Sequence, residues 1–123
     1  MVSLRAQNND STIITVKKTK DFVFNGDGKA DAWKATNFIK LKKKTATGVN
    51  YTTLFKILYS DTGIYCLFHC EDSLITSTLK EDFADLYNED VVEAFFWPNE
   101  KSVIYFEYEL SPYNYELPIL VPN

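Results

Sequence analysis

The sequence of 123 residues is poor in the side chains on which most metalloproteins and many enzymes depend. It contains one histidine, two cysteines and one methionine. A zinc site needs more Cys and His than this, and a Ser-His-Asp or Cys-His arrangement would depend on His69 alone. A haem bound through Met and His has only Met1 and His69, and a spectrum without a Soret band would exclude it. We therefore expect that the protein is not an enzyme.

Long apolar runs are also absent. No segment approaches the roughly 20 residues of a membrane span, and no secretory apolar region follows Met1 in the chain as written. The formal net charge of −4 and the pI near 4.9 give no attraction to nucleic acid or anionic lipid. The lysine run Lys40–Lys44 is a local exception, interpreted as a solvated strand face, with phosphate binding as the alternative. We expect no nucleic-acid partner and no membrane span.

The two cysteines, Cys66 and Cys70, fall in one predicted strand. At ~3.3 Å per residue they lie roughly 13 Å apart, which is too far for a disulfide. We interpret them as small buried hydrophobic residues.

The residues that are abundant point to β-structure. Hydrophobic residues make up 46% of the chain and aromatic residues 15%, and such flat, stiff side chains favour strands. Turn residues separate the apolar runs. We predict one domain over residues 1–123, an all-β antiparallel sandwich (immunoglobulin-like or jelly-roll-like) with little helix. The predicted strands are Ser11–Val16, Asn37–Lys42, Thr53–Tyr59, Ile64–Cys70, Val91–Trp97 and Val103–Leu110, with helical turns in Ala30–Ala35 and Asp72–Glu89.

The last predicted hairpin carries acids and aromatic rings on one face. Period-two alternation assigns one set to the core: Val92, Ala94, Phe96, Ile104, Phe106, Tyr108 and Leu110. The outer set includes Glu93, Phe95, Trp97, Tyr105, Glu107 and Glu109. A turn about Asn99 and Glu100 predicts Ala94 opposite Phe106 and Glu93 opposite Glu107. Because like charges across a strand pair are destabilising, a lysine, a bound cation or a ligand's hydroxyl groups should offset them.

Aromatic faces beside carboxylates suit a sugar. Pyranose C–H bonds stack on a ring, and vicinal hydroxyls donate to a carboxylate. Tyr87, at the start of the strand, adds another ring to Phe95, Trp97 and Tyr105. The alternative is a second core layer covered by another strand, and composition does not decide between them.

Three stretches together resemble carbohydrate-binding module family 9. They are VFNG (Val23–Gly26) leading to Trp33, LFKILYSDTGIYCLFHCED (Leu54–Asp72), and YNEDVVEAFF (Tyr87–Phe96). The resemblance implies a non-catalytic β-sandwich that binds oligosaccharide or polysaccharide, serves glycoside hydrolases in polysaccharide catabolism, and often carries structural Ca²⁺. It also implies a secreted, cell-surface or periplasmic location in a bacterium.

The resemblance also implies roles for individual residues. Glu93 matches the acid that hydrogen-bonds sugar hydroxyls, and Tyr87 takes the place of a stacking Trp. Glu107 stands where sugar binders have a basic residue. Asp72 and Asp90 match acids near a Ca²⁺ site, although Asp90 fits loop ordering better. With Tyr105 from the strand pattern, the predicted sugar-binding residues are Tyr87, Glu93, Tyr105 and Glu107.

The C-terminal end departs from the family pattern. Family members continue with further strands after the equivalent of Leu110, and these supply a second stacking Trp. We therefore expect a module that lacks the last strands. The alternative function is a structural or protein-interaction sandwich that has lost the sugar site, with exposed edges that invite self-association. Three prolines would blunt such an edge: Pro112, Pro118 and Pro122.

Two enzyme-like or metal-like readings are weaker. The predicted register would place Glu93 and Glu107 at a distance suited to a glycosidase pair, but a flat sheet face desolvates neither of them selectively. The segment Asn25–Asp31 superficially resembles an EF-hand loop. It lacks the Gly at position six, the closing Glu and flanking helices, so a turn is predicted there.

Overall fold

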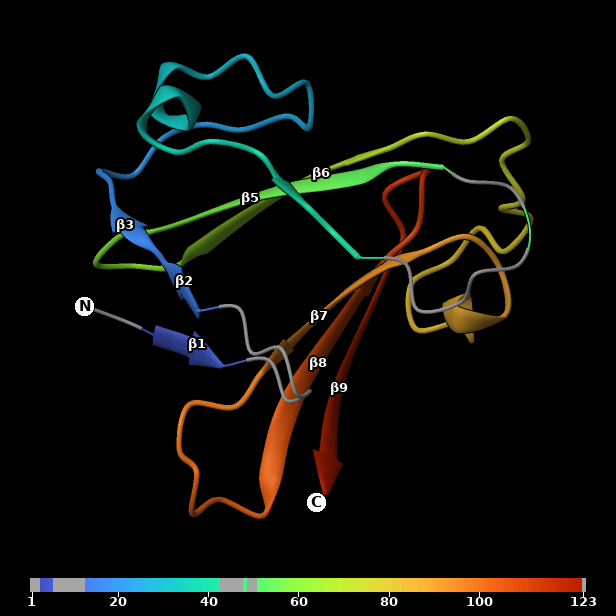
Figure 1. The fold of residues 1–123 in the computed structure, drawn as a ribbon. Coiled ribbons are helices and arrows are strands. Elements are labelled where there is room, and N and C mark those ends of the chain that lie inside the picture. The colour runs from blue at the N-terminus through green and yellow to red at the C-terminus, as the bar shows by residue number, and fades with distance from the viewer. Residues whose placement is uncertain (1–2, 6–12, 43–47, 49–50, 123) are drawn as a thin grey trace. The chain divides into compact units, whose positions relative to one another are not determined.

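The computed structural model describes residues 3–5, 13–42, 48 and 51–122. These residues form strands and two short 3₁₀ helices, with no α-helix among them, so the predicted all-β class is confirmed. Two larger sheets supply the strands of the predicted antiparallel sandwich. None of the helices in the described part is long and apolar enough to cross a bilayer. The elements (Figure 1) are β1 (Ser3–Arg5), β2 (Ile13–Thr15), β3 (Lys17–Lys18), η1 (Asp31–Ala35), β4 (Ile39–Lys40), β5 (Thr53–Tyr59), β6 (Ile64–Cys70), η2 (Leu86–Asn88), β7 (Val92–Phe96), β8 (Ile104–Leu110) and β9 (Glu116–Pro122).

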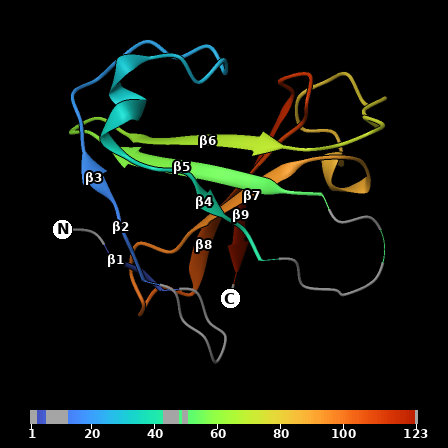
Figure 2. The ribbon, with the colours of Figure 1, turned by 45° about the horizontal axis from the view of Figure 1, so that its top comes forward.

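The chain divides into two compact units, residues 1–71 and residues 72–123. In the first unit the predicted hairpin is confirmed, since β5 and β6 pair from Thr53–Cys70 to Tyr59–Ile64 (Figure 2). On the other edge of β5, β4 pairs antiparallel near its start and β3 pairs parallel near its end. Strands β1 and β2 form a separate antiparallel pair. The predictions for Ser11, Lys43 and Lys44 lie outside the described residues.

The core of the first unit gathers around one tryptophan. Trp33 is 4% exposed and clusters with Leu58 and Leu67, which project from the same face of the β5–β6 hairpin. The ring of Phe22 meets Trp33 edge-on at 5.4 Å and stacks on Tyr65 at 4.5 Å. These contacts hold η1, the predicted helical turn, against the sheet.

The segment Asn25–Asp31 forms the predicted turn. The backbone N–H of Asp27 donates to Asn25 Oδ1 at 3.2 Å, and that of Lys29 donates to Asp27 Oδ1 at 2.9 Å. Gly28 has a φ of +68°, and a Cβ there would lie 3.1 Å from Leu67 Cδ2. The asparagine and aspartate oxygens therefore serve the turn itself.

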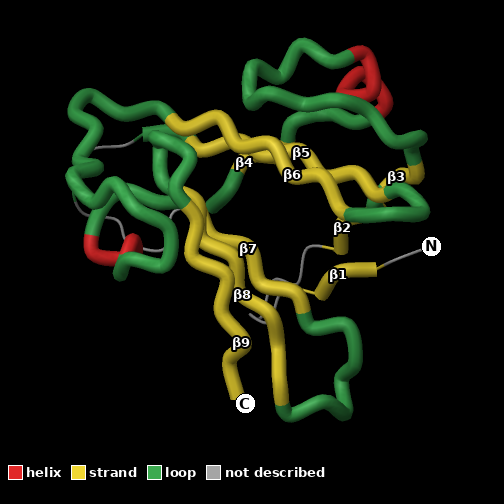
Figure 3. The backbone as a smooth tube through the Cα atoms, turned by 180° about the vertical axis from the view of Figure 1, so that it is seen from behind, coloured by secondary structure: helices red, strands yellow, loops and turns green. Residues whose placement is uncertain are grey.

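The second unit holds a three-stranded antiparallel sheet in the order β7-β8-β9 (Figure 3). No strand was predicted after Leu110, but β9 pairs with β8 along its whole length. This strand was missed because prolines normally argue against a strand. The N–H of Ser111 donates to the carbonyl of Tyr115, so the N–H positions of Pro118 and Pro122 fall on the outer edge, where no ladder bond to β8 is lost.

The predicted register of β7 against β8 is wrong by two residues. Ala94 was predicted opposite Phe106 but pairs with Tyr108. By the same shift, Phe96 pairs with Phe106 instead of Ile104. The loop between β7 and β8 is longer than a two-residue turn because Asn99 orders a wider one. Its Oδ1 accepts the N–H of Lys101 at 3.0 Å, and its carbonyl accepts the N–H of Ser102 at 2.8 Å. A shift of two preserves the side-chain faces. The predicted grouping of side chains into two faces therefore holds, but the set assigned to the core is not buried. Ile104 is 47% exposed, and the other six members are half-buried.

Candidate functional site

Three glutamates meet on one face of the β7–β8 pair. One carboxylate oxygen from each of Glu93, Glu107 and Glu109 lies within 4.8 Å of the others. We call these three residues the acidic cluster. The predicted pairing of Glu93 with Glu107 is wrong, since Glu93 lies directly opposite Glu109 and Glu107 lies opposite Phe95. Like charges therefore still face each other across the strand pair.

The three carboxylates differ in their contact with water. Glu93 is exposed, Glu107 is half-buried and Glu109 is only 1% exposed. Glu109 was predicted to face outward into solvent, and this prediction is wrong because the side chain is buried. It lies on the predicted face, but helix η2 contacts β8 and carries Leu86, which is 1% exposed. No local pattern reveals such a cover.

Burial raises the pKa of Glu109, and the charges of Glu93 and Glu107 raise it further. The backbone N–H of Tyr87 acts in the opposite direction, as a donor to this carboxylate. Oε2 of Glu109 has no hydrogen-bond partner among the described residues. A buried carboxylate oxygen without a partner is costly and rare, so this atom marks a place where a further ligand would be stabilising.

Exposed rings lie on or beside the same strand pair as the acidic cluster. Tyr87 and Phe95 are each 53% exposed and Trp97 is 43% exposed. The ring of Phe95 lies 6.0 Å from that of Tyr105, tilted by 51°, and Phe95 is the cross-strand partner of Glu107. The indole N–H of Trp97 donates to the carbonyl of Ser102 at 3.0 Å, which fixes that ring beside the loop.

The structure thus brings several predicted site residues onto one surface. Glu93 and Glu107 are neighbours in the acidic cluster, and Tyr105 is packed beside Phe95. Tyr87 joins them through its backbone bond to Glu109; the nearby carboxylate of Asp85, followed by burial, raises the pKa of its phenol. Sequence reasoning placed Glu109 on this face but missed its burial and its role at the centre of the group.

The two predicted Ca²⁺ ligands lie in the loop that precedes β7. Oδ1 of Asp72 accepts the N–H of Leu74 at 3.0 Å, and Oδ2 of Asp90 accepts the N–H of Thr76 at 2.6 Å. The N–H of Asp90 donates back to the carbonyl of Thr76. Their hard oxygens suit Ca²⁺, yet among the described residues the one three-acid group with metal-ligand spacing does not include them. In the structure both aspartates order the loop.

Glu89 provides a second closure of the same loop. Its carboxylate accepts the N–H of Thr78 at 2.6 Å and that of Leu79 at 3.0 Å, and the hydroxyl of Thr78 also donates to it. These donors lower the pKa of Glu89. Together, Glu89 and Asp90 tie residues 76–79 to the short segment between η2, which carries Tyr87, and β7, which carries Glu93.

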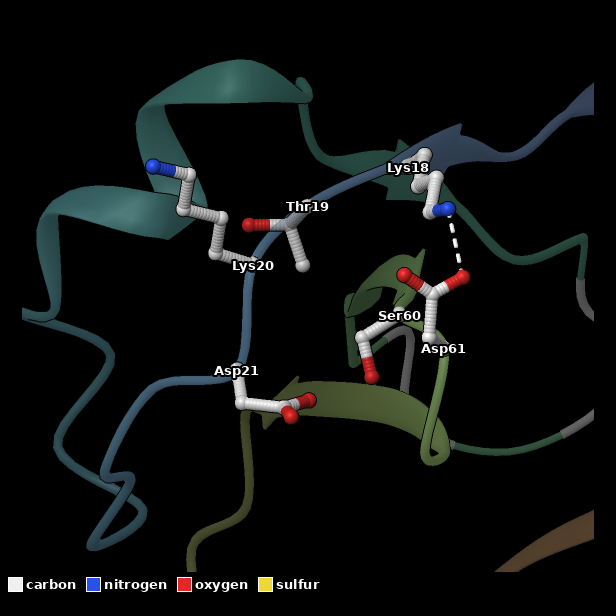
Figure 4. A pocket seen from close by; sticks show the side chains of 6 residues that line it. All are labelled: Lys18, Thr19, Lys20, Asp21, Ser60 and Asp61. Carbon is white, nitrogen blue, oxygen red and sulfur yellow. Dashed lines mark hydrogen bonds and ion pairs between the residues drawn. The ribbon is translucent and has the colours of Figure 1, made fainter.

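Two hollows lie elsewhere on the units. One, of about 520 Å³, is lined by six residues, Lys18, Thr19, Lys20, Asp21, Ser60 and Asp61 (Figure 4). Lys18 pairs with Asp61, and Asp21 accepts the hydroxyls of Thr62 and Tyr65. A second hollow of similar volume lies along residues 79–89 beside Phe83. The first has no aromatic side chain in its lining, and the second has the ring of Phe83 with the acids Glu81, Asp85 and Glu89.

Comparison with known proteins gives one match. A family model described as carbohydrate family 9 binding domain-like matches residues 26–118. Neither the curated proteins nor the solved structures contain a significant match. The matched range includes the acidic cluster, the exposed rings and the loop that carries Tyr87.

Proposed function

Because the chain belongs to the carbohydrate family 9 binding domain-like family, we propose that it binds oligosaccharide or polysaccharide through the outer face of β7 and β8. The observation that supports this proposal is the exposure of Tyr87 and Phe95 next to Glu93 and Glu107. Flat rings offer stacking surface to the C–H face of a pyranose, and carboxylates accept its hydroxyl protons.

Each side chain has a distinct part in this proposal. Tyr87 is the stacking platform, and Glu93, the exposed acid, accepts two hydroxyl donors. Glu107 accepts another from the side of the Phe95 ring, with which it pairs. Tyr105 is half-buried and packs against Phe95, so it forms the wall of the surface.

The proposal is binding without catalysis. A glycosidase needs two carboxylates, one with a raised pKa, and the acidic cluster contains such a group in Glu109. However, a general acid must reach its substrate, and Glu109 at 1% exposure is covered. The chemistry of the cluster therefore supports holding a ligand rather than cleaving it.

The wider context of the proposal follows from the family. We infer an accessory role in recognition of plant-type polysaccharides, linked to glycoside hydrolases, in a secreted, cell-surface or periplasmic setting. Ca²⁺ at Asp72 and Asp90 belongs to the same proposal. The alternative is a structural or protein-interaction domain without sugar binding.

Isothermal titration calorimetry with xylo- and cello-oligosaccharides, after a glycan-array screen, tests the proposal. Tyr87→Ala and Glu93→Ala should each abolish the binding heat while the circular dichroism spectrum stays unchanged. Tyr87→Phe keeps the ring and should retain most of the affinity, and Glu100→Ala, an exposed acid in the hairpin loop, should bind like the unmodified chain. No heat with any sugar on the array would overturn the proposal in favour of the interaction domain.

A further inference from the structure

The acidic cluster has no counter-ion among the described residues. The ion pairs among the described residues all lie within the first unit. They join Lys18 to Asp61, Lys29 to Asp27 and Lys34 to Asp31. Residues 72–123 contain 11 acidic and two basic side chains, a formal net charge of −9. A unit with this charge attracts cations over its whole surface.

The buried carboxylate of the cluster also has an oxygen without a hydrogen-bond donor among the described residues. Glu109 is 1% exposed, and its Oε2 has no hydrogen-bond partner in the described part of the chain. Its carboxylate is aimed at those of Glu93 and Glu107, with one oxygen of each residue within 4.8 Å of the others. Removing a carboxylate from water is compensated only by hydrogen bonds or an opposite charge, and the described protein atoms provide no cation there.

We propose that Glu93, Glu107 and Glu109 together bind a hard divalent cation of the Ca²⁺ class. Ca²⁺ holds its oxygen ligands at 2.3–2.6 Å, so two oxygens on opposite sides of one ion are about 5 Å apart. The mutual spacing of at most 4.8 Å fits this limit. The ligand set consists of carboxylates alone, which suits Ca²⁺ and disfavours zinc.

The different exposures of the three residues suit such a site. Glu109 forms the buried floor, Glu107 is half-buried, and Glu93 is open to solvent. An ion would therefore enter from the solvent side and keep water at its remaining positions. The tether from the Tyr87 N–H to Glu109 holds the floor in place.

This inference shares Glu93 and Glu107 with the proposed sugar surface. It goes beyond sugar binding, because it concerns a different ligand and is tested without any sugar. It also differs from the Ca²⁺ expected at Asp72 and Asp90, which lie outside the acidic cluster. A failure of cation binding would leave the carbohydrate proposal standing, and the reverse also holds.

The test is titration of CaCl₂ into the full chain at pH 7 after removal of metals with EDTA, followed by calorimetry. Terbium luminescence, sensitised through the tyrosine and tryptophan side chains of the protein, gives an independent signal. We expect saturable binding, and Glu109→Gln and Glu93→Gln should each weaken it by about tenfold or more, since Ca²⁺ affinity follows ligand charge. Because Glu93 is exposed, Glu93→Gln tests the site without changing a buried residue.

The controls separate this site from other acids. Glu100→Gln should leave the affinity for Ca²⁺ unchanged, and the double variant Asp72→Asn, Asp90→Asn should retain the sensitised terbium signal. The proposal is overturned if no saturable binding occurs at millimolar Ca²⁺. It is equally overturned if binding survives in Glu93→Gln and Glu109→Gln but disappears in the double aspartate variant.

Discussion

Glu93 and Glu109 lie directly opposite each other on β7 and β8, one exposed to solvent and the other 1% exposed. A cross-strand pair of like charges is destabilising by itself, and the burial of one member increases the cost. The pair therefore destabilises the sheet locally, and a bound ligand or cation would reduce this cost. Its effect on the free energy of unfolding is measurable in the absence of both.

Glu109→Gln should stabilise the protein when divalent cations are removed. The substitution deletes a buried charge beside Glu93, and the new amide group is able to donate to Glu107 while its oxygen still accepts from Tyr87. We expect a gain of about 1 kcal/mol in the free energy of unfolding, measured by urea denaturation in EDTA. Glu100→Gln is the matched control and should change stability little. A loss of stability in Glu109→Gln alone would show that the charge is compensated inside the folded chain.

Local sequence patterns were sufficient for part of this fold. The β5–β6 hairpin follows from two apolar runs and the turn Ser60–Gly63, where the hydroxyl of Ser60 accepts the N–H groups of Thr62 and Gly63. The faces of β7 and β8 follow from alternation alone, which is insensitive to a shift of two residues.

The remaining features depend on contacts between distant residues or on side chains in loops. The β7–β8 register is set by Asn99 and by the bond from Trp97 to Ser102. Strand β9 was not predicted because prolines normally argue against a strand. Here they lie where no backbone hydrogen bond to β8 is needed. The burial of Glu109 depends on η2, about 20 residues earlier in the chain, and no window over β8 contains that information.

The core of the first unit should be sensitive to truncation at Leu58. This side chain is 0% exposed and packs with Trp33 and Leu67, so Leu58→Ala leaves a cavity. We expect a loss of about 2–5 kcal/mol in the free energy of unfolding, measured by urea denaturation. Ile64→Ala in the same hairpin is the control, because Ile64 is 54% exposed and should lose much less. Equal losses in both variants would contradict the assignment of the core.

The two glycines of the turn before η1 form a matched pair. Gly26 and Gly28 both have positive φ, +81° and +68°, but only at Gly28 would a Cβ meet another side chain, Leu67 at 3.1 Å. Both alanine variants should lose about 1–2 kcal/mol from the backbone conformation. Gly28→Ala should lose more, because Leu67 belongs to the packed core. Thermal melts of the two variants measure the difference, and a larger loss for Gly26→Ala would contradict it.

The two cysteines should react at very different rates with a thiol reagent. Burial raises the pKa of the Cys66 thiol to about 11, so little thiolate forms at pH 8, and the thiolate is the reactive species. Cys70 is exposed and should be alkylated first. Peptide mass spectrometry during iodoacetamide labelling follows both sites, and labelling in urea gives the unfolded reference. Faster labelling of Cys66 in the folded protein would show that this strand opens more readily than its packing indicates.

Asp21 should contribute stability that is present at neutral pH and lost in acid. Hydrogen bonds from Ser60, Thr62 and Tyr65 lower its pKa, with the hydroxyls of Thr62 and Tyr65 at 2.7 and 2.8 Å. Because the folded pKa lies below the ordinary value of about 4, folding favours the charged form. The contribution is complete above that value and declines as the pH falls through the folded pKa. Urea denaturation of Asp21→Asn and the unmodified chain at pH 7 and pH 3 should show a difference that shrinks in acid, whereas an equal difference at both values would assign these bonds no preference for the carboxylate.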